Sequence, residues 1–337
     1  MSKPTLKTIA QATGLAQTTV SRALRDDPKI AENTRKRVAD AAREIGYVPD
    51  RAAQRLRTGR TNVIALVLSP HSEIIGFRGS IMAGLSDALA GTSFHLTMTP
   101  YDSCVDPMRP VETIVRNRLA DGVVFAGTQH DDPRVEFLLS EDFPFVTHGR
   151  TRRQDEHPWC DYDNACFTEL ALERLAERGR RRVVLFPPDA AYTFSSHMKE
   201  AAASRSKSLG LHVTTPNGLT LASKAQAIQD FVVRQLSIGS APDAFICPGE
   251  VLALAVMAAI EDNGLTVGRE VDIVAKQTSA VFDLVRPRVD TIFEDLRSSG
   301  RSLGQILLRR ISGECGALQV LQAPETRFRD IEAPVPA

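Results

Sequence analysis

The sequence predicts an α/β protein in two parts: a small helical unit at the N-terminus and a large doubly wound α/β body. The first 60 residues hold 13 of the 41 lysines and arginines but only 6 of the 41 acidic residues, so they carry a net charge of +7 and the rest carries −7. Within this basic part, short segments of helical period are separated by a glycine. From Thr61 onward, short apolar runs alternate with amphipathic segments, which is typical of strands and helices in a parallel sheet.

The composition bounds the class of protein. With 337 residues and 43% hydrophobic content, the chain can form two or three domains with a large core. Its five cysteines are scattered, and no CxxC pair or Cys/His cluster has metal-site spacing, so we expect reduced thiols, no metal and no cofactor. The N-terminus lacks an apolar signal core, and no apolar run reaches membrane-spanning length. We therefore expect a soluble, cytoplasmic protein with no membrane partner.

The basic part begins with two short helices joined by a tight turn. Thr5 to Ala12 predicts the first helix and Leu15 to Leu24 the second. Between them, Gly14 can adopt the left-handed conformation that ends a helix. The side chains expected to face inward are Leu6, Ile9 and Ala10 in the first helix, and Ala16, Val20, Ala23 and Leu24 in the second. Helix, glycine-containing turn and helix form a helix-turn-helix pattern.

The outer face of the second helix is polar. It carries the amide, hydroxyls and guanidinium of Gln17, Thr18, Ser21 and Arg22. Such groups can read base edges or hold phosphates in a major groove, and the net positive charge favours a polyanionic partner. The alternative is an ordinary helical hairpin with a solvated face.

A third helix and a short basic segment complete this part. Ala31 to Ile45 predicts the helix, whose start is weak because Ala31 stands where a Ser or Thr cap is expected. Arg51 to Arg57 then offers about two helical turns, too few to be stable alone in water. Leu56 is its one large apolar residue. The segment is either a linker or a hinge that folds on DNA and inserts Leu56 into a minor-groove step.

Five segments of the chain, in this order and spacing, resemble the lactose-repressor family of bacterial transcription regulators. They are residues 8–15 (TIAQATGL), 19–24 (TVSRAL), 34–38 (TRKRV), 46–50 (GYVPD) and 51–56 (RAAQRL). The resemblance implies a DNA-binding headpiece over 1–49, a hinge helix and linker over 50–60, and a dimerising regulatory domain over 61–330 like the periplasmic sugar-binding proteins. Residues 331–337 are then a tail.

The resemblance also implies which residues contact double-stranded operator DNA. Gln17, Thr18 and Arg22 match family positions that face bases. The full set implied is Thr5, Leu6, Gln17, Thr18, Thr19, Ser21, Arg22, Asn33, Thr34, Tyr47, Arg51, Ala53, Gln54 and Leu56.

The chain from Thr61 onward predicts a doubly wound sheet. Val63 to Leu68 is a near-continuous apolar run typical of a central parallel strand, and a helix follows over Gly79 to Leu89. Later strands are expected to begin near Phe94, Gly122, Phe145, Val183, Leu211, Ala244, Ile273, Val289 and Leu318. The resemblance implies two subdomains, N over about 61–162 and 291–322 and C over about 163–290 and 323–330. Crossovers are expected near Asp163-Asn164 and near Arg288 to Thr291.

Ligands of open α/β sheets bind beyond the carboxyl ends of the strands. That rule selects polar and aromatic residues that follow each predicted strand. The candidates are His71, Glu73, Phe77, Thr128, His148, Arg150, Trp159, Asp161, Phe194, His197, Gly249, Glu250, Lys276 and Gln277. Aromatic faces together with charged hydrogen-bonding groups suit a polyhydroxylated ligand. For any single candidate, a solvated loop residue is the alternative.

Some of these positions depart from the family pattern. His197 stands where the family usually has an effector-binding Arg, Gly249-Glu250 replaces a common Asn-Asp, and Gln277-Thr278 replaces an Asp pair. These departures leave the fold intact but put the transfer of any particular ligand in doubt. Residues 276–279, with 71–77 and 147–150, resemble a subgroup that responds to α-glucosides or related oligosaccharides.

Two other function classes remain to be weighed. An enzyme on an α/β scaffold is disfavoured because no P-loop, GxGxxG, HExxH or GxSxG pattern occurs, which leaves no catalytic candidate. A periplasmic sugar-binding protein would require a signal peptide and would not carry the basic unit. The sequence therefore predicts a ligand-responsive DNA-binding regulator, a repressor of carbohydrate uptake or catabolism genes. The sign of the effector's action stays open.

Overall fold

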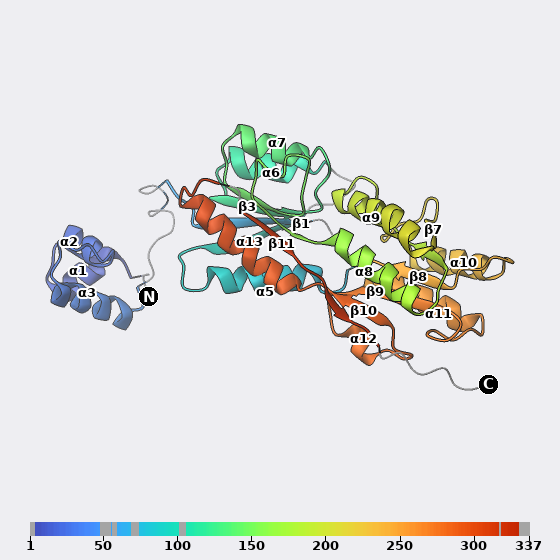
Figure 1. Ribbon diagram of the computed structural model, residues 1–337. Coiled ribbons are helices and arrows are strands. Elements are labelled where there is room, and N and C mark those ends of the chain that lie inside the picture. The colour runs from blue at the N-terminus through green and yellow to red at the C-terminus, as the bar shows by residue number, and fades with distance from the viewer. Residues whose placement is uncertain are drawn as a thin grey trace. The chain divides into compact units, whose positions relative to one another are not determined.

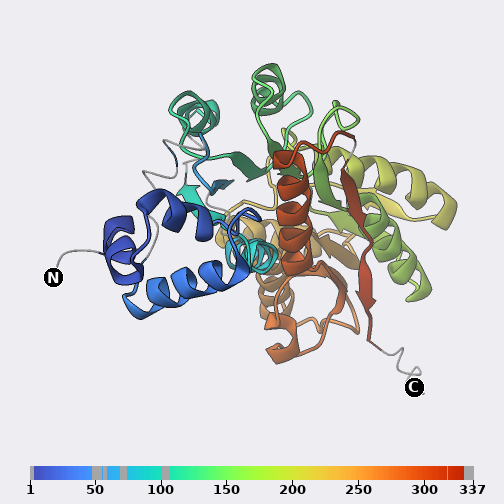
Figure 2. The ribbon, with the colours of Figure 1, turned by 90° about the vertical axis from the view of Figure 1, so that its left-hand side faces the viewer.

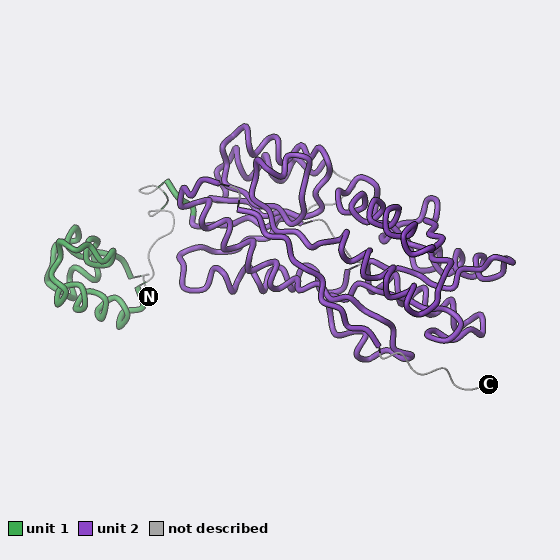
Figure 3. Tube along the Cα trace, viewed as in Figure 1, with its two compact units in different colours: residues 1–61 green, residues 62–337 purple. Residues whose placement is uncertain are grey.

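The computed structural model describes residues 4–47, 55, 59–68, 74–100, 106–316 and 318–329. The chain divides into two compact units, residues 1–61 and 62–337 (Figure 3). Several expectations lie outside the described residues: the hinge helix, with Arg51, Ala53, Gln54 and Leu56, the candidates His71 and Glu73, and the tail.

The described residues 4–47 of unit 1 form three helices around a small apolar core. The helices are α1 (Leu6–Thr13), α2 (Gln17–Ala23) and α3 (Glu32–Glu44) (Figure 1). The buried side chains of the core are Ile9, Val20, Ala23, Val38 and Ala42. Ala16 is exposed rather than inward-facing, because it is the N-cap residue of α2 and precedes the helical face.

The helix ends follow from local chemistry. Thr5 is the N-cap of α1: its hydroxyl accepts from the Thr8 amide at 3.4 Å, and its own amide donates to the Thr8 hydroxyl at 3.2 Å. Gly14 ends α1 with φ of 66°, a conformation that costs glycine little. As the sequence indicates, Ala31 gives α3 no side-chain cap.

Unit 2 contains two six-stranded sheets. The first has the order β11-β5-β4-β3-β1-β2 and the second the order β12-β10-β9-β8-β6-β7. All pairs are parallel except β10 with β12. The strands of the first sheet are β1 (Val63–Leu68), β2 (His95–Pro100), β3 (Gly122–Ala126), β4 (Phe145–His148), β5 (Trp159–Tyr162) and β11 (Gln319–Gln322). Those of the second are β6 (Arg182–Leu185), β7 (His212–Thr214), β8 (Ala244–Cys247), β9 (Asp272–Gln277), β10 (Asp290–Phe293) and β12 (Glu325–Arg327).

Helices cover both faces of each sheet, which is the doubly wound architecture that the sequence predicts (Figure 1). Those packed with the first sheet are α5 (Phe77–Leu89), α6 (Met108–Arg116), α7 (Pro133–Ser140) and α13 (Leu296–Ile311). Those of the second are α8 (Asn164–Glu177), α9 (Thr193–Leu209), α10 (Ala225–Leu236), α11 (Glu250–Asp262) and α12 (Val281–Leu284). Apolar clusters on both faces of each sheet explain why its central strands are continuous apolar runs.

The structure differs from the sequence prediction in the position of the second crossover and in two strands. Because Asp290–Phe293 pairs with both β9 and β12, the second crossover follows Phe293 instead of lying near Arg288 to Thr291. The sequence analysis also missed β5 and β12. Strand β5 is Trp-Cys-Asp-Tyr and β12 is Glu-Thr-Arg, so neither is an apolar run, and only pairing with neighbours makes them strands. Within the described part of the chain, no helix is long and apolar enough to span a membrane.

Helices α5 and α13 pack at very short range in the first subdomain (Figure 2). A Cβ added to Gly84 would lie 2.0 Å from the carbonyl oxygen of Arg297, and one added to Gly300 would lie 2.3 Å from that of Ile81. Both obstacles are backbone atoms, which cannot rotate away. The two glycines are therefore required for this helix contact.

We predict that Gly84→Ala destabilises unit 2 by roughly 1–3 kcal/mol, the usual cost of overpacking a tight contact. Thermal unfolding followed by circular dichroism measures it. Gly79→Ala on the same helix is the matched control, because an added Cβ there meets nothing within 4 Å. Gly79→Ala should be neutral or stabilising, since Ala is the better helix former. Equal midpoints for the two variants would contradict the close-approach explanation.

Candidate functional site

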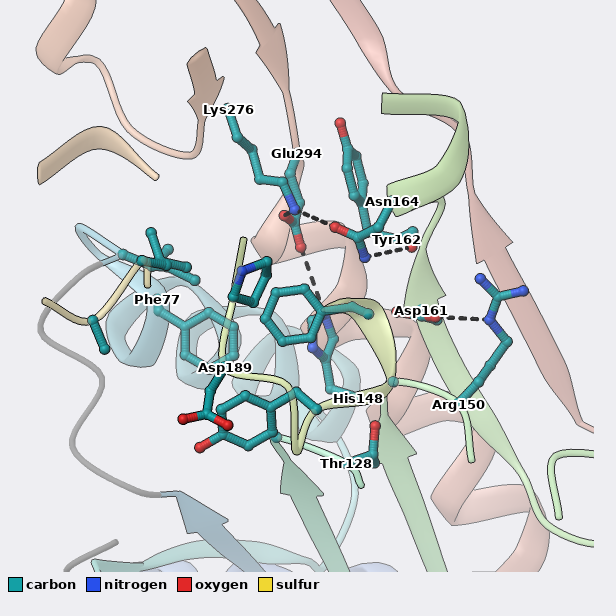
Figure 4. Close-up of a pocket in the computed structure, with 18 residues that line it drawn as sticks. Phe77, Thr128, His148, Arg150, Asp161, Tyr162, Asn164, Asp189, Lys276 and Glu294 are labelled. Atoms are coloured by element: carbon teal, nitrogen blue, oxygen red, sulfur yellow. Dashed lines mark hydrogen bonds and ion pairs between the residues drawn. The ribbon is translucent and has the colours of Figure 1, made fainter. Parts of the chain in front are cut away.

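A cavity lies between the two subdomains at the carboxyl ends of the strands (Figure 4). Its empty volume is about 770 Å³, part of it open to solvent. The lining residues are Ile74, Phe77, Gly127, Thr128, His148, Gly149, Arg150, Asp161, Tyr162, Asn164, Pro188, Asp189, Tyr192, Phe194, Leu221, Ala222, Lys276 and Glu294. Most of them lie at or after the carboxyl ends of strands in both sheets, as the rule for open α/β sheets requires.

One part of the lining is charged and internally paired. Arg150 Nε donates to Asp161 Oδ2 at 2.8 Å. Lys276 Nζ lies 3.0 Å from Glu294 Oε2 and donates to Asn164 Oδ1 at 2.6 Å. Figure 4 shows Lys276 with Glu294 and Asn164 in one group and Arg150 with Asp161 in another. The pairs leave carboxylate and amide atoms with further capacity to accept or donate, so they can serve hydroxyl groups.

The Lys276 ammonium group is held over aromatic rings as well. It lies 4.3 Å from the ring centroid of Tyr162 and 5.4 Å from that of Phe167. Asn164 is the first residue of α8 and donates its Nδ2 to the carbonyl oxygen of Tyr162 at 3.0 Å. Cation–π contacts and this fixed amide therefore hold Lys276 in one orientation.

The remainder of the lining is largely apolar. Tyr192 and Phe194 stack with ring centroids 5.8 Å apart and an interplanar angle of 22°. Phe77 lies across the cavity, with its ring edge to the His148 ring at 5.6 Å between centroids. Asp189 is exposed and accepts from the amide of Ala191 at 2.9 Å. Aromatic faces beside hydrogen-bonding groups match the apolar faces and hydroxyl edges of a sugar ring.

A set of hydrogen bonds, here called the clasp, joins the subdomains beside the cavity. The carbonyl oxygen of Thr128 accepts from the amide of Thr193 at 3.1 Å and from its hydroxyl at 3.3 Å. Gln129 and Tyr192 form an isolated β-bridge, and His130 Nε2 lies 2.8 Å from Ser196 Oγ. The clasp is polar and small, so the subdomains can separate without breaking either core.

Seven of the predicted effector residues line the cavity: Phe77, Thr128, His148, Arg150, Asp161, Phe194 and Lys276. The structure places the other described candidates elsewhere, namely Trp159, His197, Gly249, Glu250 and Gln277. Burial lowers the pKa of His197, and the neighbouring Arg150 charge lowers it further. The neutral ring can accept a hydrogen bond through Nδ1, which lies 3.4 Å from Arg150 Nη2. His197 therefore contacts Arg150, which lines the cavity, and does not line the cavity itself.

Three candidates make internal contacts in this structure and do not line the cavity. Trp159 is buried and donates its indole N–H to the carbonyl oxygen of Gln154 at 3.0 Å. The Glu250 carboxylate is 1% exposed and accepts from the amides of Thr278 and Ser279 at 2.9 and 2.8 Å. Gln277 is also buried. Its side-chain amide oxygen accepts from the Thr291 hydroxyl at 2.8 Å, and its Nε2 donates to a backbone carbonyl oxygen. Gly249 precedes α11 as its N-cap residue.

The sequence analysis missed several lining residues. Glu294 directly follows β10, so a correct end for that strand would have selected it by the carboxyl-end rule. Asn164 begins α8 at the first crossover, where the capping residue Asp163 gave a signal. Tyr162 was hidden because β5 was not recognised as a strand. Asp189, Tyr192, Leu221 and Ala222 come from loops or a helix start, which no strand pattern marks.

Unit 1 presents the polar face of α2 expected from the sequence. Gln17 and Thr18 are exposed, and Thr19 and Ser21 are half-buried. Arg22 Nε donates to Asp27 Oδ2 at 2.8 Å, and this hydrogen bond is the largest cause of the lowered pKa of Asp27. On α3, Asn33 is exposed and Thr34 half-buried.

Three of the residues expected to contact DNA also have structural roles in unit 1. Leu6 and Tyr47 pack against its apolar core, and the Thr5 hydroxyl caps α1. Since the side chains of Leu6 and Tyr47 belong to this packing, any DNA contact would come from their outer edges.

Comparisons with known proteins agree with this organisation. The family model for bacterial regulatory proteins of the lacI family matches residues 5–50, and that for the periplasmic binding protein-like domain matches residues 172–330. The HTH-type transcriptional regulator AglR of Rhizobium meliloti (strain 1021) is 32% identical over 317 residues, covering 91% of this chain and 87% of that protein. The HTH-type transcriptional regulator CelR of Thermobifida fusca is 26% identical over 321 residues, covering 93% of each.

Solved structures show the same fold. The transcriptional regulator CelR–cellobiose complex matches with a TM-score of 0.71 and 22% identity, covering 97% of this chain and 99% of that one. The lac repressor dimer bound to operator and the anti-inducer ONPF matches with a TM-score of 0.80 and 20% identity, covering 96% and 98%. A helix-turn-helix unit followed by a periplasmic-binding-protein-like domain defines a DNA-binding transcription regulator, not an enzyme. The chain belongs to the lacI family of bacterial regulatory proteins.

We predict that Gln17→Ala changes which operator sequence unit 1 prefers. Loss of a bidentate contact to one base should cost about 1–3 kcal/mol at one base-pair position and little elsewhere. Competition binding against operators varied one base pair at a time measures this. Uniform weakening on every sequence would instead assign Gln17 to phosphate contact.

Proposed function

We propose that this regulator is a repressor whose affinity for operator DNA changes when a sugar or oligosaccharide binds in the cavity. The proposal depends on one observation: the cavity combines fixed ion pairs with aromatic faces between two subdomains that are joined beside it by a few hydrogen bonds. Such a ligand touches both subdomains and can therefore favour one spacing between them. We propose that it acts in the cytoplasm, with carbohydrate uptake or catabolism genes as its targets.

Within the sugars, we propose an α-glucoside or a related oligosaccharide. Residues 276–279 and 147–150 resemble the α-glucoside-responsive subgroup, and Lys276 and Arg150 from these segments line the cavity. The solved CelR complex contains cellobiose, itself a glucose disaccharide, in a protein of the same fold. His71 and Glu73 remain proposed contacts.

We also propose that the chain acts as a homodimer. One helix-turn-helix unit reads one half-site, and a symmetric operator mirrors a twofold axis in the protein. The hinge over 50–60 would then pair with its counterpart over the minor groove.

The test of the sugar response uses the full chain with a panel that includes maltose, sucrose, trehalose and methyl α-D-glucoside. A specific ligand stabilises the folded state by mass action, by about 2.7 kcal/mol at 100 times its Kd. The same sugar must change the operator Kd, and the operator must change the sugar Kd by the same factor. Sugar binding that leaves operator affinity unchanged would overturn the regulatory role.

We predict that Arg150→Ala abolishes the response to the sugar, because the side chain lines the cavity beside Asp161. His197→Ala should weaken the response less, since this ring contacts Arg150 and does not line the cavity. Isothermal titration calorimetry and operator binding with and without sugar are the measurements. The matched control is His212→Ala, an exposed histidine on β7. A normal response in Arg150→Ala would place the sugar elsewhere.

We predict that Leu56→Ala strongly weakens binding to operator DNA and largely spares weak, salt-sensitive binding to random DNA. A wedge inserted at a base step contributes only where the DNA can be kinked, whereas phosphate contacts act on every sequence. Salt titrations of the wild type and variant on both DNAs test this. Equal losses of affinity for operator and random DNA would indicate that the hinge is only a tether.

A further inference from the structure

The two cations described in the cavity lining already have carboxylate partners. The Arg150 guanidinium pairs with Asp161, and Lys276 pairs with Glu294. Lys276 is only 4% exposed, and the carboxamide of Asn164 accepts a second of its three N–H bonds. An anionic group entering the cavity would therefore have to compete with a built-in carboxylate for either cation.

Carboxylates also outnumber cations in this lining. The described lining contains three carboxylates, Asp161, Glu294 and Asp189, and two cations, Arg150 and Lys276, which gives a charge of −1 when His148 is neutral. Asp189 forms no ion pair with the described residues and is exposed at the cavity. The pairs Arg150–Asp161 and Lys276–Glu294 are shielded from water, so salt screens them weakly.

We propose that the cavity selects uncharged sugars and rejects sugar phosphates and sugar acids, with Glu294 as the specificity-determining residue. This rests on the proposed function, since it takes the cavity as the effector site. A phosphate monoester carries between one and two negative charges at neutral pH and binds tightly where a cation is available to it. Here each described cation is neutralised, whereas hydroxyl groups can still bond to the carboxylate oxygens.

Glu294 has this role because of its position. It is the first residue after β10, at the crossover to α13, and its carboxylate reaches Lys276 on the adjacent strand β9. Its other oxygen, Oε1, lies 3.9 Å from His148 Nε2, on a strand of the first subdomain. Removing this one negative charge leaves Lys276 inside the cavity with an uncompensated positive charge, held by Asn164 and two rings.

The experiment compares maltose with maltose 6′-phosphate, and methyl α-D-glucoside with glucose 6-phosphate, by isothermal titration calorimetry. Wild-type protein should bind a neutral sugar and bind its phosphate at least about a hundredfold more weakly. In Glu294→Gln the ratio of the two Kd values should fall at least about tenfold, which corresponds to about 1.4 kcal/mol. The double variant Glu294→Gln/Lys276→Met has neither charge and should show no gain for the phosphate.

Control variants keep the test decisive. Glu141→Gln makes the same change at an exposed position at the end of α7 and should leave the ratio unaltered. If Glu294→Gln fails to fold, Asp189→Asn at an exposed position should lower the ratio severalfold. Wild-type protein that binds the phosphate as tightly as the neutral sugar overturns the inference alone. Protein that binds no member of either pair or of the wider sugar panel overturns the proposed function and the inference together.

Discussion

The carboxyl ends of parallel strands in both sheets meet at one cleft, and this constraint determines most of the regulator's design. Parallel strands need crossover helices, which cover the faces of each sheet and leave the strand ends as the open edge. The chain passes between the sheets after Tyr162, after Phe293 and after Gln322. Two of these passages deliver Asn164 and Glu294 directly to the cavity. The connections that join the subdomains are thus also part of the cavity lining.

At the amino ends of its strands, away from the cavity, the second sheet is held by buried ion pairs. Asp272 and Asp290, at the starts of β9 and β10, are fully buried and pair with four arginines: Arg174, Arg178, Arg180 and Arg329. Burial raises the pKa of Asp272, but hydrogen bonds from Arg178, Arg180 and Arg329 outweigh it and leave that pKa below its ordinary value. The Arg329 amide also donates to Asp290 at 2.6 Å, which attaches the segment after β12 to this base.

The two subdomains are packed separately and are joined beside the cavity by hydrogen bonds. Each subdomain has its own apolar clusters on both sheet faces, whereas the clasp offers only a few hydrogen bonds between Thr128 to His130 and Tyr192 to Ser196. Domain motions use weak interfaces between tightly packed bodies. Residues that line the cavity lie on both sides of the clasp, so a ligand can alter the spacing of the subdomains without disturbing either core.

The sequence by itself determined the class of fold and the order of its elements. Periodicity located the three helices of unit 1 and ten of the twelve described strands of unit 2, because apolar spacing reflects which face is buried. The carboxyl-end rule selected Thr128, Arg150 and Lys276, because it depends only on strand direction. Tertiary structure decided what local pattern does not encode. Strands β5 and β12 exist through pairing, Glu250 and Gln277 turn inward to satisfy buried hydrogen bonds, and Glu294 enters the cavity because β10 joins the second sheet. Each of these depends on partners distant in sequence, and only the folded chain brings those partners together.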